Sequence, residues 1–335
     1  MSARHVRLGV VTTARGLDAS FRTWLLHHHA IGFEHLYVVL DAPDEDHATA
    51  AWVRAHPTLS RVVTLIPADA AHRAAVEARP ECTAFQADYA RIVVVRQMLN
   101  VAVVMARAIA DGVDWLFHLD ADELVTPYAR PDERLADYLA RVPDAVDEVI
   151  FPNVEAVPPS DEVDDPFRAI TLFRKSPYYL RYKQFEHVFT AWNGASGRFK
   201  LFNAYITGKS ALRLSATDVA FVPHSVHHFL PLRFTANVHI EDEGGPIVRH
   251  YPHCGLARFV ARFTGFNRAR VNTYGEAAWE DDLYSQAEAL VREGREAELP
   301  ALYRRLVRLD DAALRAKLER RGLLETLPAI DLREA

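Results

Sequence analysis

The feature that most constrains the fold is the segment 113–125, which reads VDWLFHLDADELV. Its largely apolar run from Trp115 to Leu119 is typical of a buried central strand. An acidic cluster of Asp120, Asp122 and Glu123 follows directly. Residues two apart in an extended chain point the same way, so Asp120 and Asp122 can present their carboxylates to one point.

Two like charges held at the end of a hydrophobic strand are costly unless something neutralises them, and a divalent cation is the simplest neutraliser. Carboxylate oxygens favour magnesium, manganese or calcium. A second Asp-x-Asp pattern, at 44–46, follows no such strand, and we interpret it as a solvated helix start. The alternative for the 120–122 copy is an acidic loop that caps the next helix. Because ligands of open α/β sheets bind at the carboxyl ends of strands, we favour the metal site.

Composition limits the possible partners and compartments. The chain has 335 residues, 50% hydrophobic and 25% charged, which suits one large domain or two coupled ones. Its net charge of -6 and pI of about 6.2 disfavour nucleic acid as a partner. Two cysteines form no disulfide framework, which indicates a reducing compartment. With no signal-like N-terminus and no uninterrupted apolar run of about 18 residues, we predict a cytoplasmic protein without a transmembrane segment.

The first 125 residues alternate between strand and helix patterns. This alternation predicts a mostly parallel sheet flanked by helices, the α/β class. Right-handed crossovers then bring the polar turns after three strands to one edge, as one candidate site. The predicted strands are 6–11, 36–40, 61–66 and 115–119; the helices are 21–31, 48–55 and 85–110; the polar turns are 12–15, 41–44 and 120–123.

The rest of the chain changes character twice. Short strand patterns continue to about residue 250, around a Pro-rich and acid-rich loop at 152–166, and helical patterns continue from 256 to about 324. We therefore predict a domain at 1–265, with a nucleotide-binding half (1–125) and an acceptor-side half (126–265). A helical C-terminal extension follows at 266–335. The strand patterns are 148–151, 170–173, 199–202, 211–214 and 220–222.

Histidines and basic residues supply further candidates. His27-His28-His29 lie on a helix, face different sides and fit a packing role. His224 and His250 are candidate third ligands to a metal at Asp120 and Asp122, and a zinc hydrolase built on the histidines is an alternative. Four basic residues could hold a diphosphate: Arg15, Arg91, Lys209 and Arg249. Walker, dinucleotide-binding and serine-hydrolase signatures do not occur.

Several of these segments together resemble a known family. The chain resembles family 2-type glycosyltransferases of the GT-A fold, within the branch related to family 92 and its bacterial relatives. The resemblance covers about residues 6–265, and the later segments match more weakly than the first ones. The residues that carry it are Val11-Thr12-Thr13-Ala14-Arg15, Trp24 to Val38, Gln97 with Asn100, Asp114 to Glu123, Gly208 to Arg213, Val222-Pro223-His224 and Arg249-His250-Tyr251.

The resemblance implies an activity and a site. Asp120 and Asp122 would bind a Mn²⁺ or Mg²⁺ ion that bridges the diphosphate of a nucleotide-sugar donor. The nucleotide pocket would be lined by Thr12, Ala14, Arg15 and Asp41. An inverting transfer to a glycan, lipid-linked or small hydroxyl acceptor also needs a base, for which Glu155 and Glu186 are favoured over Asp218.

Two features depart from the family pattern. Arg15-Gly16-Leu17-Asp18 stands where the family has Arg/Lys-Asn-Glu, and His253-Cys254 replaces the usual Lys-Ser. The alternative to an enzyme is a non-catalytic protein of the same fold that binds a nucleotide or a glycan.

Overall fold

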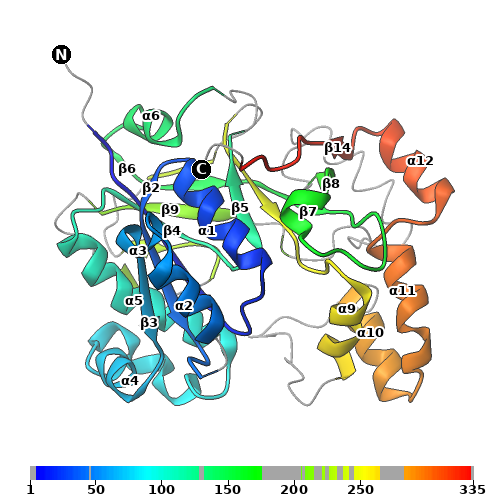
Figure 1. Cartoon of the computed structure of the whole chain (residues 1–335), viewed down its shortest axis with the longest axis horizontal. Helices are drawn as coiled ribbons and strands as arrows, with labels where there is room; N and C mark the ends of the chain where they lie inside the picture. The colour runs from blue at the N-terminus through cyan, green and yellow to red at the C-terminus, as the bar shows by residue number, and fades with distance from the viewer. Residues whose placement is uncertain are drawn as a thin grey trace. The chain divides into compact units, whose positions relative to one another are not determined.

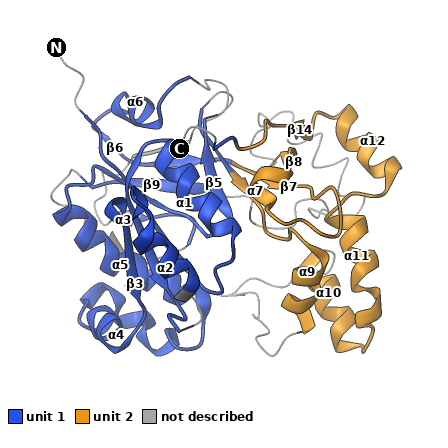
Figure 2. Cartoon of the chain, viewed as in Figure 1, with its two compact units in different colours: residues 1–152, 208–248, 331–335 blue, residues 153–207, 249–330 orange. Residues whose placement is uncertain are grey.

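A computed structural model describes the chain in ten residue ranges. The chain folds into two compact units (Figure 2). Unit 1 comprises 1–152, 208–248 and 331–335, and unit 2 comprises 153–207 and 249–330. The chain thus leaves unit 1 after Pro152 and returns at Gly208, whereas the sequence-based division was continuous, with boundaries at 125 and 265. The described residues are 5–44, 47–127, 132–175, 205, 208–214, 221–222, 226–231, 237–240, 245–264 and 283–332.

Unit 1 is built on a seven-stranded sheet in the order β12-β6-β9-β4-β1-β2-β3 (Figure 1). Strands β1, β2, β3 and β4 are mutually parallel where they pair, and β9 runs antiparallel between β4 and β6. The predicted class, a mostly parallel α/β sheet flanked by helices, is confirmed. The strands are β1 (Leu8–Ala14), β2 (Phe33–Leu40), β3 (Val63–Pro67), β4 (Trp115–His118), β6 (Val146–Phe151), β9 (Lys209–Arg213) and β12 (Asn237–Ile240).

The core of unit 1 lies against helix α5 (Val93–Ala110), whose apolar residues pack on Val11, Tyr37 and Leu116 of the sheet. Phe117 follows Leu116 and therefore points to the opposite face. There its ring contacts those of Phe33 and Phe151, at centroid distances of 5.0 and 5.3 Å. The remaining described helices of unit 1 are α1 (Ser20–Ala30), α2 (His47–Ala55), α3 (Leu59–Val62), α4 (Ala70–Glu77), the 3₁₀ helix η1 (Pro80–Asp88) and α6 (Leu135–Ala140).

One predicted helix boundary and one predicted strand boundary were wrong. The helix expected over 85–110 begins only at Val93, because 80–88 winds as a 3₁₀ helix and Ile92 is extended. The strand expected from 61 begins at Val63, since 59–62 forms a helical turn. The alternation of elements was nevertheless predicted correctly, because it depends on hydrophobic periodicity and not on the boundaries.

One described helix, α5, is long and apolar enough to span a membrane by length and composition alone. Half of that window is buried within the protein, where α5 packs on the sheet. The helix is therefore accounted for as a core element of unit 1.

Unit 2 holds a small sheet and a group of helices. Strands β14 (Leu324–Thr326), β8 (Leu172–Lys175), β7 (Asn153–Ala156) and β13 (Ile247–His250) are neighbours in this order. The helical pattern expected to continue to about residue 324 ends at Arg320, and Leu324 begins a strand instead, because Gly322 adopts a left-handed conformation with φ of 66°. The helices are α7 (Pro166–Ala169), α9 (Leu256–Thr264), α10 (Leu283–Arg292), η4 (Glu296–Glu298), α11 (Leu299–Leu306) and α12 (Ala312–Arg320).

A few elements complete the described chain. They are β5 (Glu123–Thr126), β10 (Phe221–Val222) and β11 (Leu230–Pro231). The strand predicted at 199–202 lies outside the described residues.

Candidate functional site

The carboxyl ends of β1, β2 and β4 lie at one edge of the unit 1 sheet. The Asp41 N–H donates to the Ala14 carbonyl oxygen at 2.8 Å, which joins the chain after β2 to the end of β1. The Leu119 N–H donates to the Val11 carbonyl oxygen at 3.1 Å, which joins the chain after β4 to the same strand. The gathering of the three polar turns, expected from topology, is confirmed.

Helix α5 contacts all three strand ends through polar side chains near its start. Arg96 donates from Nε and Nη2 to the two carboxylate oxygens of Asp41, at 2.8 and 3.0 Å. Gln97 Nε2 donates to Asp120 Oδ1 at 2.6 Å. Asn100 sits one turn further along the helix, where its Nδ2 donates to Thr13 Oγ1 at 3.1 Å.

Asn100 is also the centre of a buried polar network. Its Oδ1 lies 2.8 Å from His72 Nε2 and accepts a hydrogen bond from the Tyr89 hydroxyl at 3.0 Å. Asn100 itself is fully buried. A buried network of this kind fixes side-chain positions, because each unpaired member would cost free energy. The three strand ends are therefore held in one arrangement by a single helix.

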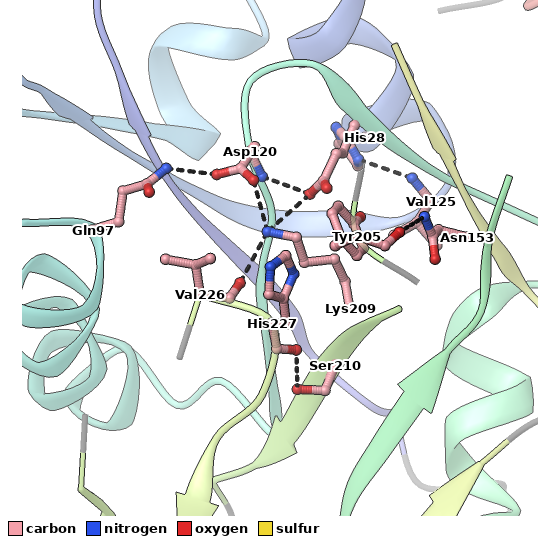
Figure 3. A network of polar contacts seen from close by, with 11 residues as sticks. His28, Gln97, Asp120, Val125, Asn153, Tyr205, Lys209, Ser210, Val226 and His227 are labelled. Atoms are coloured by element: carbon pink, nitrogen blue, oxygen red, sulfur yellow. Dashed lines mark hydrogen bonds and ion pairs between the residues drawn. The ribbon is translucent and has the colours of Figure 1, made fainter. Parts of the chain in front are cut away.

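The acidic strand end contains a buried lysine (Figure 3). Lys209 Nζ lies 2.8 Å from Asp120 Oδ2 and 3.3 Å from Glu123 Oε2, and it donates to the Val226 carbonyl oxygen at 2.9 Å. The Lys209 and Glu123 side chains are fully buried, and that of Asp120 is 24% exposed. Glu123 Oε2 also accepts from the Asp120 N–H at 2.8 Å, which fixes the turn between them. The Lys209 ammonium neutralises the acidic cluster, a role that the sequence analysis gave to a metal ion.

This ion cluster sets the charge of its neighbours. Burial alone would raise the pKa of Asp120, but the Lys209 ammonium, with smaller effects of His118 and His227, holds it well below its usual range. Burial, with the nearby Lys209 charge, lowers the pKa of His118 to about 3. The site thus pairs an ionised Asp120 with a neutral His118 at neutral pH.

The residues expected to line a nucleotide pocket fall into two groups. Thr12 and Ala14 are buried within β1, and Asp41 is held by Arg96. Arg15 and Arg91 are exposed, and Arg91 precedes α5 in the turn after η1. Their contact with a nucleotide stays a prediction.

Two of the candidate base and metal-ligand residues, Glu155 and His250, belong to unit 2. Glu155, in β7 of unit 2, is 1% exposed, and its Oε2 lies 3.7 Å from Arg174 Nη1. A base must touch the acceptor, and this conformation does not present the Glu155 carboxylate to solvent. His250, also in unit 2, is buried with its ring 4.9 Å from that of Tyr205. Glu186, Asp218 and His224 lie outside the described residues.

These contacts limit which side chains of the acidic cluster could bind a metal ion. Within the described ranges, no group of three His, Cys, Asp or Glu side chains is arranged to hold a metal ion. Both carboxylate oxygens of Asp120 accept hydrogen bonds, from Gln97 and Lys209. Asp122 is partly exposed in the turn before β5. An ion here would need oxygens from a ligand in addition to Asp122, which is the usual binding mode of Mg²⁺ with substrate phosphates.

The sequence reasoning missed three partnerships. Lys209 was considered for a diphosphate and not for the acidic cluster, Gln97 was named only through the family resemblance, and Arg96 was given no role. A signal for two of them was present, because Arg96, Gln97 and Asn100 are polar residues grouped within two turns of a mostly apolar helix.

Comparisons with known proteins agree with the sequence resemblance in general terms. No family model matches the chain. Two proteins of Arabidopsis thaliana, both named glycosyltransferase-like, are similar to it. One is 26% identical over 337 residues, which span 95% of this chain and 69% of the relative. The other is 27% identical over 237 residues, or 70% of this chain but only 44% of the relative.

Two solved structures are more distant. A structure of GalNAc-T7 with UDP, GalNAc and Mn²⁺ has a TM-score of 0.37 and 10% identity, over 95% of this chain and 55% of its own. The apo form of mouse xyloside xylosyltransferase 1 has a TM-score of 0.29 and 12% identity, over 63% of this chain and 68% of its own. At these TM-scores neither structure carries an argument about this chain.

Proposed function

We propose that the chain is a glycosyltransferase that moves a sugar from a nucleoside-diphosphate sugar to a hydroxyl acceptor. Support comes from the two relatives named glycosyltransferase-like, and from the family resemblance of the first strand, the following helix and the acidic strand end. The site observation that carries the proposal is the joining of three strand ends by α5, at the edge where α/β sheets bind ligands.

The acidic cluster fits a divalent cation that arrives with a diphosphate. Asp120, Asp122 and Glu123 carry three formal negative charges against one positive charge on Lys209, which leaves -2 among these four side chains. We propose that Asp122 holds Mn²⁺ or Mg²⁺, with the remaining oxygens from the donor and water. When bound, the ion would neutralise the charge that develops on the leaving diphosphate. His224 and His250 are proposed as candidates for a further ligand.

Within this proposal, the donor nucleotide lies along the ends of β1 and β2. Asp41, whose orientation is fixed by Arg96, and the exposed Arg15 are the candidate contacts. The backbone of Thr12 and Ala14 would form the floor, because their side chains are buried. The exposed Arg91 is a candidate contact for the diphosphate of the donor.

An inverting transfer requires a base that takes the proton of the acceptor hydroxyl. Glu155 would have to leave its contact with Arg174 to act in this way. Glu186 is the second candidate. We propose the inverting outcome on the resemblance alone, and the anomeric configuration of the product, measured by NMR, decides it.

A donor panel tests the proposal. Nucleoside diphosphates and their sugars are added with and without Mn²⁺, and the unfolding midpoint and sugar release are measured. The expected result is a Mn²⁺-dependent rise of the midpoint with one nucleotide family, together with turnover of its sugar. Binding without turnover across donors and acceptors would favour the non-catalytic alternative. A midpoint shift with zinc alone would favour the hydrolase.

The Asp122→Ala variant tests the metal ligand. We expect transfer to fall by at least about 100-fold, because the ion supplies several kcal/mol of transition-state stabilisation. Asp137→Ala, an exposed carboxylate on α6 of the same unit, is the matched control and should keep its activity. Undiminished transfer in Asp122→Ala would refute the assignment.

A further inference from the structure

The Lys209 ammonium occupies a position that has the ligand chemistry of a cation site. Its three acceptors are two carboxylate oxygens, from Asp120 and Glu123, and the carbonyl oxygen of Val226. Hard oxygens in this combination are the ligands that proteins use for Ca²⁺ and Mg²⁺. An ammonium has three N–H donors, and the three acceptors match them. Lys209 therefore has no further donor for a phosphate unless it releases one of these oxygens.

The backbone fixes the lysine in this position. Gly208, which precedes it, has φ of 75°, and a Cβ there would lie 2.4 Å from the carbonyl oxygen of Phe151. Only glycine fits this close approach, and it starts β9 directly between β4 and β6. Lys209 pairs in register with Phe151, so its side chain emerges at the strand end that carries the acidic cluster. The segment at 226–227 closes the other side, since Ser210 Oγ donates to the His227 carbonyl oxygen at 3.2 Å.

Hydrogen bonds therefore hold both carboxylate oxygens of Asp120. Gln97 binds Oδ1 and Lys209 binds Oδ2, so the carboxylate is oriented by a neutral donor and a charged one. A carboxylate that binds a metal ion needs an oxygen directed at the ion, and both oxygens of Asp120 already accept hydrogen bonds. The contacts of Asp120 do not fit that role.

We propose that the Lys209 ammonium is the resident cation of the acidic strand end, where it takes the place of a divalent ion between Asp120, Glu123 and the Val226 carbonyl. A divalent ion that enters with a donor is then bound through Asp122 and not through Asp120; this second half rests on the proposed function. Lys209 and Asp120 are positioning residues: they hold the turn that presents Asp122.

Removing the ammonium tests the first half. Unfolding midpoints of wild type and Lys209→Ala are measured after removal of metals, and again after addition of Mn²⁺ alone. We expect a lower midpoint for Lys209→Ala without metal, and a rise with Mn²⁺ that exceeds the wild-type rise by about 5 °C, because the vacated oxygens then bind the ion. Equal rises in the two proteins would overturn the proposal.

A second variant covers the case in which Lys209→Ala does not fold. Lys209→Ala/Glu123→Gln removes one positive and one negative charge together, and so leaves Asp120 as the one ionised carboxylate among the acceptors of Lys209. We expect it to fold, with a higher midpoint than Lys209→Ala and no extra Mn²⁺ rise over wild type, since one of the two carboxylate ligands is gone. An extra Mn²⁺ rise in this variant would contradict the ligand set.

Mn²⁺ binding followed by electron paramagnetic resonance tests the second half. With Mn²⁺ and inorganic pyrophosphate together as the probe, where the pyrophosphate stands in for the donor diphosphate, Asp122→Asn should weaken Mn²⁺ binding at least tenfold, and Asp120→Asn less than threefold. Equal weakening by the two substitutions, or the absence of Mn²⁺ binding to wild type, would overturn this half. None of these readouts requires sugar transfer, so a failure of the transferase assignment in the donor panel is distinguishable from a failure here.

Discussion

Arg96 binds Asp41 through two charge-assisted hydrogen bonds, and thereby connects the first turns of α5 to the end of β2. Two close neighbours on the same helix, Gln97 and Asn100, bind the ends of β4 and β1. The strand ends belong to segments that are far apart in sequence. One helix thus determines how the candidate site is assembled.

Arg96→Ala should destabilise the protein by about 2 kcal/mol, because the Asp41 side chain, only 9% exposed, would lose its charged partner. Arg107→Ala is the control: Arg107 lies on the same helix, 3.6 Å from Asp111, with 54% of its side chain exposed, and should cost at most about 1 kcal/mol. Urea unfolding of both variants measures the difference. Equal costs would contradict the clamping role of Arg96.

Asn100→Ala should cost about 3 kcal/mol of unfolding free energy, because it removes a partner from the side chains of Thr13, His72 and Tyr89 at once. Gln86→Ala is a suitable comparison, since the Gln86 amide makes one exposed bond to the Glu77 carbonyl oxygen and should cost within about 0.5 kcal/mol. Urea unfolding reports both costs. A small loss in Asn100→Ala would show that the network is dispensable.

Glu148, on β6, gives a pH dependence of stability. Burial raises its pKa, against the lowering effect of the Ser210 side chain and of the hydrogen bond from the Phe229 N–H. The folded state then holds the Glu148 proton more tightly than the unfolded state, so this contribution is present at low pH. It is lost as pH rises from the ordinary carboxyl pKa through the raised one.

Glu148→Gln tests this sign. The amide keeps an oxygen acceptor for the Phe229 N–H but does not ionise, so the variant should gain stability relative to wild type as pH rises from 4 to 8. Unfolding free energies at a series of pH values measure the gain. Glu77→Gln, which replaces an exposed carboxylate, should show no such trend. A gain that shrinks with pH would reverse the assigned direction.

Glu155→Gln should destabilise the protein by about 3 kcal/mol, because it leaves the buried charge of Arg174 without its carboxylate. Glu325→Gln removes a more exposed carboxylate, which pairs with Lys175 at 2.9 Å in the same sheet, and should cost at most about 1 kcal/mol. Chemical unfolding compares the two. A large loss of kcat in Glu155→Gln with unchanged stability would instead support Glu155 as the base.

The sequence predicted those features that depend on residues close together along the chain. The strand before Asp120 was recognisable from its apolar run, and the helix around His28 from its spacing, because burial on one face imposes a period on the sequence. The histidine run was correctly interpreted as packing: His27 and His28 are buried, and the His28 ring lies 4.1 Å from that of Trp24. The common edge of the strand ends was also predictable, since parallel strands allow no other arrangement.

The sequence by itself determined the α/β alternation and placed an acidic cluster at the end of a central strand. Only the tertiary structure decided what neutralises that cluster. Lys209 lies 89 residues from Asp120, and reaches it because β9 inserts antiparallel between β4 and β6. Hydrophobic periodicity is local and states which residues are buried. The choice of partner for a buried charge depends on which strands become neighbours, and this is settled only when the sheet forms.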